Sequence, residues 1–366
     1  MIAVAGARAQ SSSPQATPIL ISRTFGVGIG EANASDSGSL SALTWLLARS
    51  DGGSYVYDGR AERIVLINAR GSFVRTIGGS GHGNGTFGHL AGGAVLHDSL
   101  LALWDVTNQR VLVFSENGAL RTTIQLPMSG RGYVSHSARL EFTADTSGRI
   151  YARTQASVGS REFFWLRFGL DGIVLDSMPD ARPIAVTRLG SDGMRSTFGP
   201  DRIRVPYMAG GMLEGDPLAY RVETYYATAP VVSFQNNYLP VEVVEAERAE
   251  WVKALTRRGK FSSAELDTLL PKRKTAFRSL HSDRFGNIWV ERNGLAHADS
   301  SAHDALALPQ FIWRDTTAFD VFSGAGRLMY SVKLPRHTSL LAIGERRLWL
   351  NETDVSGNTT IGVYDW

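Results

Sequence analysis

The sequence predicts an all-β fold, a six-bladed β-propeller of four-stranded antiparallel blades with a short helical insertion. Three observations predict it: one turn-and-strand pattern recurs along the chain, the last copy is one strand short, and a spare strand lies near the amino terminus. A single twisted sheet cannot bury its apolar faces alone, so the copies must stack on one another. Radial stacking of six such sheets closes a ring.

The repeated unit is a turn, an alternating strand, a second strand, a second turn and a third strand. Five copies are visible, beginning at Ser50, His97, Thr146, Arg284 and Gly344. A weaker copy lies between the third and fourth of these, with candidate strands at 201–205, 219–223 and 231–234. Gly and Asp recur at the turns because tight hairpins need positive φ, which these residues adopt cheaply. Alternation of Tyr55 with Val56 places side chains against both adjoining sheets.

The carboxyl terminus is an independent test of the ring. The last copy ends at Trp366 just after its third strand, so another segment must supply the fourth. Residues Ile19 to Phe25 precede the first copy and have the composition of a strand. We therefore predict that this amino-terminal strand pairs with the strand from Ile361 to Tyr364 and closes the last blade.

Residues 18–366 are expected to form this one propeller, with the helical insertion at about 241–275. In that segment Val244, Trp251, Val252 and Leu255 have helical spacing, and Ser262 to Glu265 has the form of a capping box. The apolar stripe is expected to pack on a rim of the ring. The basic residues are expected outside, as a solvated helix face or an anionic docking patch: Arg257, Arg258, Lys260, Lys272, Arg273 and Lys274.

Residues 1–17 are predicted to be a residual signal peptide or a disordered terminus. Ala7-Arg8-Ala9 has the small-x-small form of a signal-peptidase site, and a polar run follows it. This pattern predicts export to the periplasm or the extracellular space, while a loose cytoplasmic terminus is the alternative. No segment reaches the ~18 consecutive apolar residues of a membrane span, so none is expected.

Composition narrows the classes of partner. The chain has 366 residues, of which 43% are hydrophobic and 20% charged, as in a globular protein. Its formal net charge is +3 and its basic residues are dispersed, so no nucleic-acid partner is expected. The sequence contains no cysteine, which excludes disulfides, thiolate zinc sites and cysteine nucleophiles.

Two segments resemble a known repeat. Residues 105–118 are similar to an NHL repeat, and so is the preceding glycine-rich run 78–87. The first copy matches in the same way, because Asp58 and Arg63 have the spacing of Asp105 and Arg110. The matches cover residues from about 51 to 126. The overall layout also resembles exported bacterial six-bladed propellers with a helical insertion before the fifth blade, which implies fold and export and leaves the ligand open.

The repeated Asp and Arg pairs are interpreted as structural, since each pair can fix a turn by a hydrogen bond or an ion pair. The glycine run from Gly78 to Gly85 could be a phosphate cradle, but no helix follows it. It is better interpreted as the crossing between two blades, with Phe87 as a plug.

The densest group of potential metal ligands is His297, Asp299, His303 and Asp304, on a loop of the fifth blade. Imidazole and carboxylate groups suit zinc, calcium or another divalent ion, and a solvated polar loop is the alternative. The other histidines are scattered, and any that line the central channel could act as a base or ligand. No nucleophile elbow, His-Glu-x-x-His pair or Walker pattern occurs in the sequence.

These observations predict a non-catalytic extracytoplasmic recognition or scaffold propeller, a monomer that binds a protein, peptide or glycan and requires no cofactor. The alternative is a metal-dependent hydrolase or lyase with its site at the central channel. Propeller lactonases, streptogramin lyases and peptidyl-amidating lyases are similar at the level of fold. Such enzymes assemble their sites from loops of several blades, so the sites leave no local spacing in the sequence.

Overall fold

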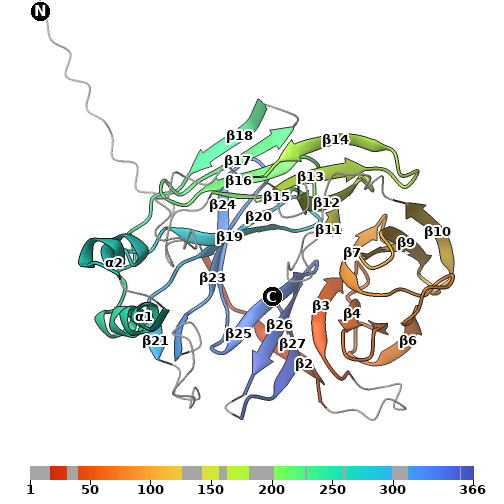
Figure 1. The fold of residues 1–366 in the computed structure, drawn as a ribbon, viewed down its shortest axis with the longest axis horizontal. Helices are drawn as coiled ribbons and strands as arrows, with labels where there is room; N and C mark the ends of the chain where they lie inside the picture. The colour runs from red at the N-terminus through yellow and green to blue at the C-terminus, as the bar shows by residue number, and fades with distance from the viewer. Residues whose placement is uncertain are drawn as a thin grey trace, which may run out of the picture.

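Six main sheets form a ring in the computed structural model, with two helices at one side (Figure 1). The structure describes residues 17–30, 40–125, 142–155, 163–180, 202–226, 229–258, 261–298, 312–354 and 356–366. Each main sheet is a blade with four antiparallel strands, and one blade carries an added fifth strand. The predicted all-β, six-bladed β-propeller is therefore confirmed.

The first three blades each use four consecutive strands. Blade 1 contains β3 (Leu43–Ala48), β4 (Ser54–Asp58), β5 (Arg63–Ile67) and β6 (Phe73–Ile77). Blade 2 contains β7 (Leu90–Leu96), β8 (Leu100–Asp105), β9 (Arg110–Ser115) and β10 (Leu120–Gln125). Blade 3 contains β11 (Phe142–Ala144), β12 (Ile150–Gln155), β13 (Phe163–Phe168) and β14 (Val174–Pro179).

The other three blades depart further from the simple repeat. Blade 4 contains β15 (Ile203–Pro206), β16 (Met212–Asp216), β17 (Arg221–Tyr226) and β18 (Ala229–Gln235). Blade 5 contains β19 (Phe277–Ser282), β20 (Ile288–Arg292), β23 (Ala318–Phe322) and β24 (Leu328–Lys333), with β1 (Thr17–Ile19) added at its edge. Blade 6 contains β25 (Thr338–Ile343), β26 (Arg347–Thr353), β27 (Thr359–Asp365) and β2 (Ser22–Gly28). A separate hairpin of β21 (Ala296–Ala298) and β22 (Trp313–Asp315) lies between β20 and β23 in the chain.

The first strand of each blade lies nearest the axis of the ring. The strands β7 and β11, β3 and β25, and β15 and β19 contact one another across blade boundaries. We call the end of the ring where these inner strands begin the mouth face, and the end where they finish the far face. The helices and the hairpin of β21 and β22 connect strands at the mouth face, because they follow β18 and β20.

Six clusters of buried hydrophobic side chains in the described residues lie between neighbouring blades. Tyr55 and Tyr57 belong to the cluster between blades 1 and 2, whereas Val56 packs with Trp349 of blade 6. Alternation along one strand thus supplies both neighbouring interfaces, as the sequence predicted. Burial of this apolar surface is the main favourable term that holds the blades together.

The amino-terminal segment closes the ring. Strand β2 pairs antiparallel with β27, and Val27 lies opposite Ile361. The predicted closure is therefore confirmed, but the strand lies three residues later than Ile19 to Phe25. Instead, β1 pairs parallel with β24 at the outer edge of blade 5. Between β1 and β2 the chain crosses from blade 5 to blade 6, and Ile19 and Ile21 pack into the cluster between these blades.

The closing strand carries an ion pair whose strength depends on pH. Arg23 on β2 donates to both carboxylate oxygens of Glu352 on β26, with Nε to Oε1 at 3.0 Å and Nη2 to Oε2 at 2.9 Å. The Tyr364 hydroxyl donates to Glu352 Oε1 at 2.7 Å. Burial acts to raise the pKa of Glu352, but the bonds from Arg23 and Tyr364 outweigh it, and the pKa lies below its ordinary value of 4.5.

We expect Glu352→Gln to lower the free energy of unfolding at pH 7 by no more than about 1 kcal/mol, since Arg23 is half exposed. A lowered folded pKa means that the carboxylate stabilises the fold above pH 4.5 and loses this effect as the pH falls through the folded pKa. The difference between wild type and variant should therefore shrink as the pH falls below 4.5. Urea unfolding at pH 3, 5 and 7 measures the difference in free energy of unfolding. A difference that does not change with pH would contradict a stabilising role of the Glu352 carboxylate.

The predicted insertion contains α1 (Glu245–Arg258) and α2 (Ser263–Leu269). Ser262 caps α2, since its Oγ accepts from Glu265 N and its backbone N donates to Glu265 Oε2 at 2.8 Å. Leu255, Leu269 and Leu270 are buried against one another between the two helices. Neither helix has the length and apolar character that a membrane span requires.

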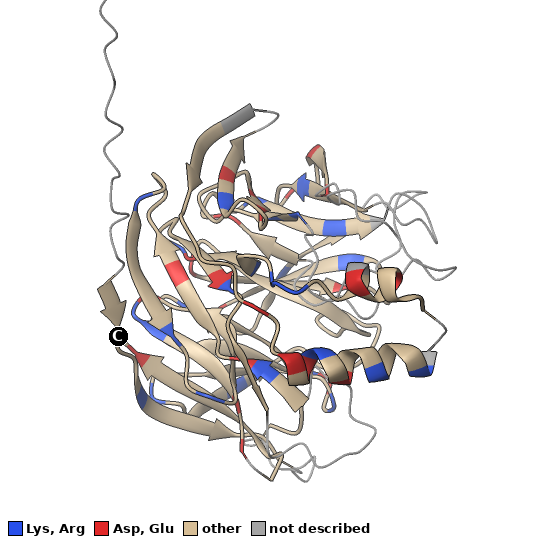
Figure 2. Cartoon of the chain, turned by 90° about the vertical axis from the view of Figure 1, so that its left-hand side faces the viewer, with Lys and Arg blue, Asp and Glu red and all other residues tan. Residues whose placement is uncertain are grey.

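The prediction for the basic residues of this insertion is wrong at Lys274. Its side chain is 1% exposed and its Nζ lies 3.3 Å from Glu247 Oε1 and 2.5 Å from Asp315 Oδ1. Glu247 belongs to the acidic start of α1, and basic residues follow toward the end of that helix (Figure 2). Lys274 is buried because it joins α1 to β22, whereas Lys272 and Arg273 are exposed as predicted.

Two further elements differ from the sequence prediction. The weak copy contains a fourth strand, β16, which has few β-branched residues and whose Glu214 is buried against Arg202 and Arg204. The predicted loop around His297 is partly strand, because β21 pairs with β22. Residues 1–16 of the predicted signal peptide lie outside the described residues, and Thr17 begins β1.

Candidate functional site

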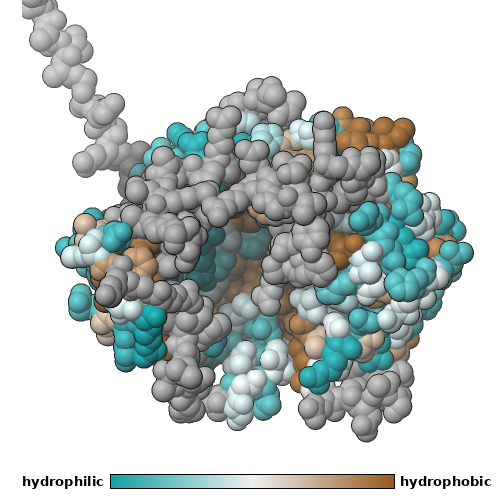
Figure 3. Space-filling view, viewed as in Figure 1, coloured by the Kyte–Doolittle hydropathy of each residue, from teal (hydrophilic) through white to brown (hydrophobic). Residues whose placement is uncertain are grey.

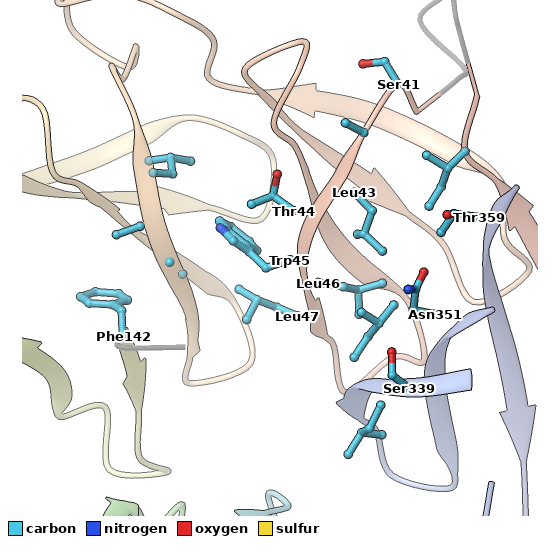
Figure 4. A pocket seen from close by; sticks show the side chains of 18 of the residues that line it. Ser41, Leu43, Thr44, Trp45, Leu46, Leu47, Phe142, Ser339, Asn351 and Thr359 are labelled. Atoms are coloured by element: carbon cyan, nitrogen blue, oxygen red, sulfur yellow. The ribbon is translucent and has the colours of Figure 1, made fainter. Parts of the chain in front are cut away.

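A cavity of about 680 Å³ lies at the mouth-face end of the central channel. We call it the pit. Its walls come from the starts of the inner strands β3, β7, β11 and β25 and from nearby parts of β26 and β27 (Figure 4). Figure 3 shows hydrophobic residues in a hollow near the middle of the ring. The lining includes Trp45, Phe142, Ser339, Asn351 and Thr359.

Two aromatic side chains lie next to the pit on opposite sides of β7; Trp45 is partly exposed and Phe142 is buried. Trp45 on β3 and Phe142 at the start of β11 flank the inner strand β7, where Gly92 and Gly93 lie. A Cβ atom at Gly93 would lie 2.9 Å from Trp45, and one at Gly92 would lie 3.0 Å from Cβ of Phe142. The glycine pair is therefore needed because a side chain at either position would crowd Trp45 or Phe142.

The pit also contains two polar atoms that lack a hydrogen bond. Trp45 Nε1 and Asn351 Oδ1 are both buried and have no partner in the structure. One is a donor and the other is an acceptor. A buried polar atom without a partner costs about 1–3 kcal/mol, and because the protein covers both atoms, this cost falls on the stability of the fold. The hydroxyl side chains of Ser339 and Thr359 lie near Asn351 (Figure 4).

The repeated aspartates hold the segments that line the pit. Asp58 is fully buried and accepts from Ser41 N at 2.9 Å, Ser41 Oγ at 2.6 Å and Ala42 N at 3.0 Å. Burial raises the pKa of Asp58, but these hydrogen bonds outweigh it and the pKa is lowered. Asp105 accepts in the same way from Gly88 N at 3.2 Å, beside His89 of the pit. The predicted ion pairs with Arg63 and Arg110 are present at 3.6 and 3.2 Å.

The far face is bridged across the axis. Arg284 in the β19–β20 turn of blade 5 donates to Asp98 Oδ2 in the β7–β8 turn of blade 2 at 2.7 Å. These two blades are opposite one another in the ring. His97 and Asp98 have φ of 47° and 59°, the positive values of a tight hairpin turn, which brings Asp98 to this position. Met208 of blade 4 also accepts from Thr146 of blade 3 at 2.8 Å. The central channel is therefore crossed by an ion pair at the far face, whereas it opens into the pit at the mouth face.

The structure tests the predicted metal ligands only in part. His297 lies on β21 opposite Arg314, away from the pit lining. Asp299, His303 and Asp304 lie outside the described residues. Within the described part of the chain, no three His, Asp or Glu side chains are grouped as they would be to hold a metal ion. Of the scattered histidines, His89 lines the pit.

The sequence analysis did not single out Trp45, Phe142 or Asn351. The residues that line the pit lie between Ile29 and Thr359, so no short motif contains them. The pair Gly92-Gly93 inside an apolar strand was the one local signal, since glycine within a strand indicates a close approach of other groups. The glycine run 78–85 is, as predicted, the crossing between β6 and β7, with Phe87 completely buried.

Comparison with known proteins supports the fold. No family model and no curated protein sequence matches the chain. An exported protein of Bacteroides fragilis has a TM-score of 0.51 at 9% identity, with 94% of each chain covered. A DUF4221 family member of Bacteroides vulgatus has a TM-score of 0.53 at 9% identity, covering 94% of this chain and 98% of that one. A streptogramin B lyase has a TM-score of 0.39 at 8% identity, covering 88% and 79%, too distant for any argument. The chain is therefore similar in fold to these two Bacteroides proteins.

Proposed function

We propose that this protein is an extracytoplasmic recognition propeller that binds its ligand in the pit, without chemical conversion. The single observation that carries the proposal is the pit itself, a cavity lined by apolar side chains together with Ser, Thr and Asn side chains. A concave, mostly apolar site with a few polar groups is the usual form of a ligand site. The ring of blades holds these groups rigidly in place.

Most side chains of the described lining can contact a ligand but cannot react with it, and His89 is the one titratable side chain among them. Its members include Ser, Thr, Asn and aromatic side chains, and none of those described is Asp, Glu, Lys or Arg. Asp58, the carboxylate next to the lining, is occupied by backbone and hydroxyl donors. The contacts therefore support recognition of a protein, peptide or glycan by shape and hydrogen bonding.

The proposal also includes a location outside the cytoplasm. Ala7-Arg8-Ala9 resembles a signal-peptidase site, and one protein of similar fold is described as exported. We therefore place the protein in the periplasm or outside the cell, as a monomer. The likeness of residues 51–126 to NHL repeats stays a prediction, as does a calcium or zinc ion bound by His297, Asp299, His303 and Asp304.

Filling the pit should abolish binding. Ser339 is an exposed residue of the lining, so Ser339→Trp should occupy the pit without changing the core. Ser99 is an equally exposed serine in the turn that follows β7 at the far face, so Ser99→Trp is the matched control. On arrays of oligosaccharides and peptides, we expect ligands that bind wild type and Ser99→Trp but lose at least about 10-fold in affinity for Ser339→Trp.

Mass spectrometry of the bound compounds completes this test. Recovery of unchanged ligand supports recognition. Conversion to product, lost on chelation, would favour the metal-dependent hydrolase or lyase instead. Equal binding by wild type and Ser339→Trp would place the ligand elsewhere and overturn the proposal.

A further inference from the structure

We infer that a second pocket, at the far face between blades 1 and 2, binds a phosphate or sulfate ester group. The pocket has a volume of about 650 Å³, which is enough for a small molecule. Its walls are the far-face turns of the two blades and the starts of their outer strands, β6 and β10. We call it the far-face pocket. It shares no lining residue with the pit, so this inference goes beyond the proposed function.

Two arginines of the far-face pocket have no carboxylate partner. Arg75 on β6 and Arg121 on β10 are both exposed, so a ligand in the pocket can reach them. Arg75 donates from Nη1 to the backbone oxygen of Asn117 at 2.9 Å, which holds its side chain across the boundary between the blades. Among the described residues, neither Arg75 nor Arg121 forms an ion pair. Both guanidinium groups therefore keep donors for a ligand.

The two acids of the lining are already bound to a third arginine. Arg49 is buried and donates from Nε and Nη2 to the two carboxylate oxygens of Asp51, at 3.1 and 2.9 Å. The hydrogen bonds from Arg49 lower the pKa of Asp51, so this acid stays charged. Arg49 also donates to Glu116. The lining has three arginines and two acids, and the unpaired cations are Arg75 and Arg121, so it attracts an anion.

Comparison of the blades shows that the fold does not require these two arginines. By its register with the preceding strand, Thr122 has in blade 2 the place that Arg75 has in blade 1. Arg121 is the extra residue of a β-bulge between β9 and β10. The extra residues at the same bulge in blades 1, 3 and 5 are apolar: Val74, Leu175 and Met329. Since stacking of the blades needs no cation at either place, a ligand explains the two arginines better than the repeat does.

The number of donors favours a tetrahedral anion over a carboxylate. Each guanidinium group can present two N–H donors to a pair of oxygens. A carboxylate has two oxygens, whereas a phosphate or sulfate monoester has three free oxygens and can bond to both arginines. The hydroxyl of Ser99 and the amide of Asn68 lie in the same lining and can donate further hydrogen bonds. Val74 and Leu100 provide apolar surface for the rest of the ester.

Calorimetric titration with four phenyl compounds tests this inference. Phenyl phosphate and phenyl sulfate carry the proposed group, benzoate is the carboxylate probe and phenol is the uncharged probe. We expect both esters to bind, benzoate to bind at least about 5-fold more weakly, and phenol not to bind. Binding of the esters should weaken between about 20 and 200 mM salt, because salt screens exposed charges.

Four variants locate the anion. Arg75→Gln and Arg121→Gln should each weaken binding of phenyl phosphate roughly 5- to 10-fold, since each removes charge-assisted hydrogen bonds. Arg60→Gln is the matched control, because Arg60 is an exposed arginine in the β4–β5 turn at the mouth face, and it should leave the affinity unchanged. Glu116→Gln removes a negative charge from the lining and should strengthen binding about 2- to 3-fold. Damage to the fold cannot produce such a gain.

The two tryptophan variants separate this pocket from the pit. Ser99→Trp should fill the far-face pocket and abolish binding of phenyl phosphate, whereas Ser339→Trp should leave it unchanged. Failure of both esters to bind would overturn the inference and leave the proposed function standing. Equal affinity of wild type, Arg75→Gln and Arg121→Gln would also overturn it, as would benzoate binding as tightly as the esters. Loss of ester binding in Ser339→Trp but not in Ser99→Trp would assign the anion to the pit and overturn it as well.

Discussion

Lys274→Met is expected to lower the free energy of unfolding at pH 7 by about 3–5 kcal/mol. The variant keeps most of the side-chain volume but removes the cation that Glu247 and Asp315 share. The side chains of these two acids are only 3% and 9% exposed, respectively. Burial already raises the pKa of Glu247, against the opposing effect of Lys274. Loss of the ammonium therefore removes the cation that Glu247 shares with Asp315, and the ion pair that Asp315 keeps among the described residues is its longer contact of 3.7 Å with Arg278. Urea unfolding followed by circular dichroism measures the effect.

Lys272→Met is the matched control, because Lys272 is exposed two residues earlier in the same segment. Its free energy of unfolding should stay within about 0.5 kcal/mol of wild type. The penalty of Lys274→Met should also shrink between pH 7 and pH 4, since protonation removes the charge that the variant leaves unpaired. Equal stability of the two variants would show that the buried lysine contributes nothing to docking of the insertion.

The charged groups around Lys274 extend from α1 to the inner strand of blade 5. Asp315 lies 3.7 Å from Arg278 on β19, and Arg278 donates to Glu291 on β20. Ser279 then donates to Glu291 at 2.5 Å and lies 2.9 Å from His281 Nε2. The helical insertion is therefore joined to blade 5 by a continuous set of ion pairs and hydrogen bonds. Such networks hold a single geometry, because each member leaves another unpaired when it moves.

Deletion of residues 2–28 is expected to lower the free energy of unfolding by on the order of 5 kcal/mol. It removes β1 and β2, with the half-buried side chains of Phe25 and Val27 and the backbone hydrogen bonds to β27. The exposed edge of β27 would also become a template for pairing with another chain. We expect a lower melting temperature and self-association that increases with concentration, measured by calorimetry and sedimentation.

Two shorter deletions separate the contributions. Deletion of residues 2–16 leaves both strands whole and should keep the melting temperature of wild type. Deletion of residues 2–21 removes β1 and the packing of Ile19 and Ile21, so an intermediate value is expected. A melting temperature for the 2–28 deletion equal to that of the 2–21 deletion would contradict the role of β2 in closing the ring.

The shape of the pit depends on closure of the ring. Its walls come from blades 1, 2, 3 and 6, so the pit has its shape only while blade 6 is locked to blade 1. Residues of β2 pack with Trp349 in that interface, where the rings of Phe25 and Trp349 lie 6.1 Å apart. A preformed pit binds with less loss of conformational freedom than one that must assemble around its ligand.

Local patterns in the sequence were enough to place the strands of the blades that have strong repeats. In blades 1 and 2, alternation and turn residues are encoded within a few positions, so β4, β5, β8 and β9 could be placed directly. β16 of blade 4 was not predicted, because a strand stabilised by buried ion pairs has no apolar alternation. The crossing of the chain from β1 to β2 was missed since pairing with β24 depends on a neighbour more than 300 residues away.

The sequence by itself determined the six-bladed ring, its closure by the amino-terminal strand and the helical insertion, because period-2 alternation, turn residues and caps are local properties. Only the tertiary structure decided where Lys274 lies and which residues form the pit. Lys274 has the sequence context of an exposed lysine, and its burial depends on Asp315, 41 residues later. Trp45, Phe142 and Asn351 line one cavity because the ring brings the inner strands of several blades to one axis, and no spacing along the chain encodes that arrangement.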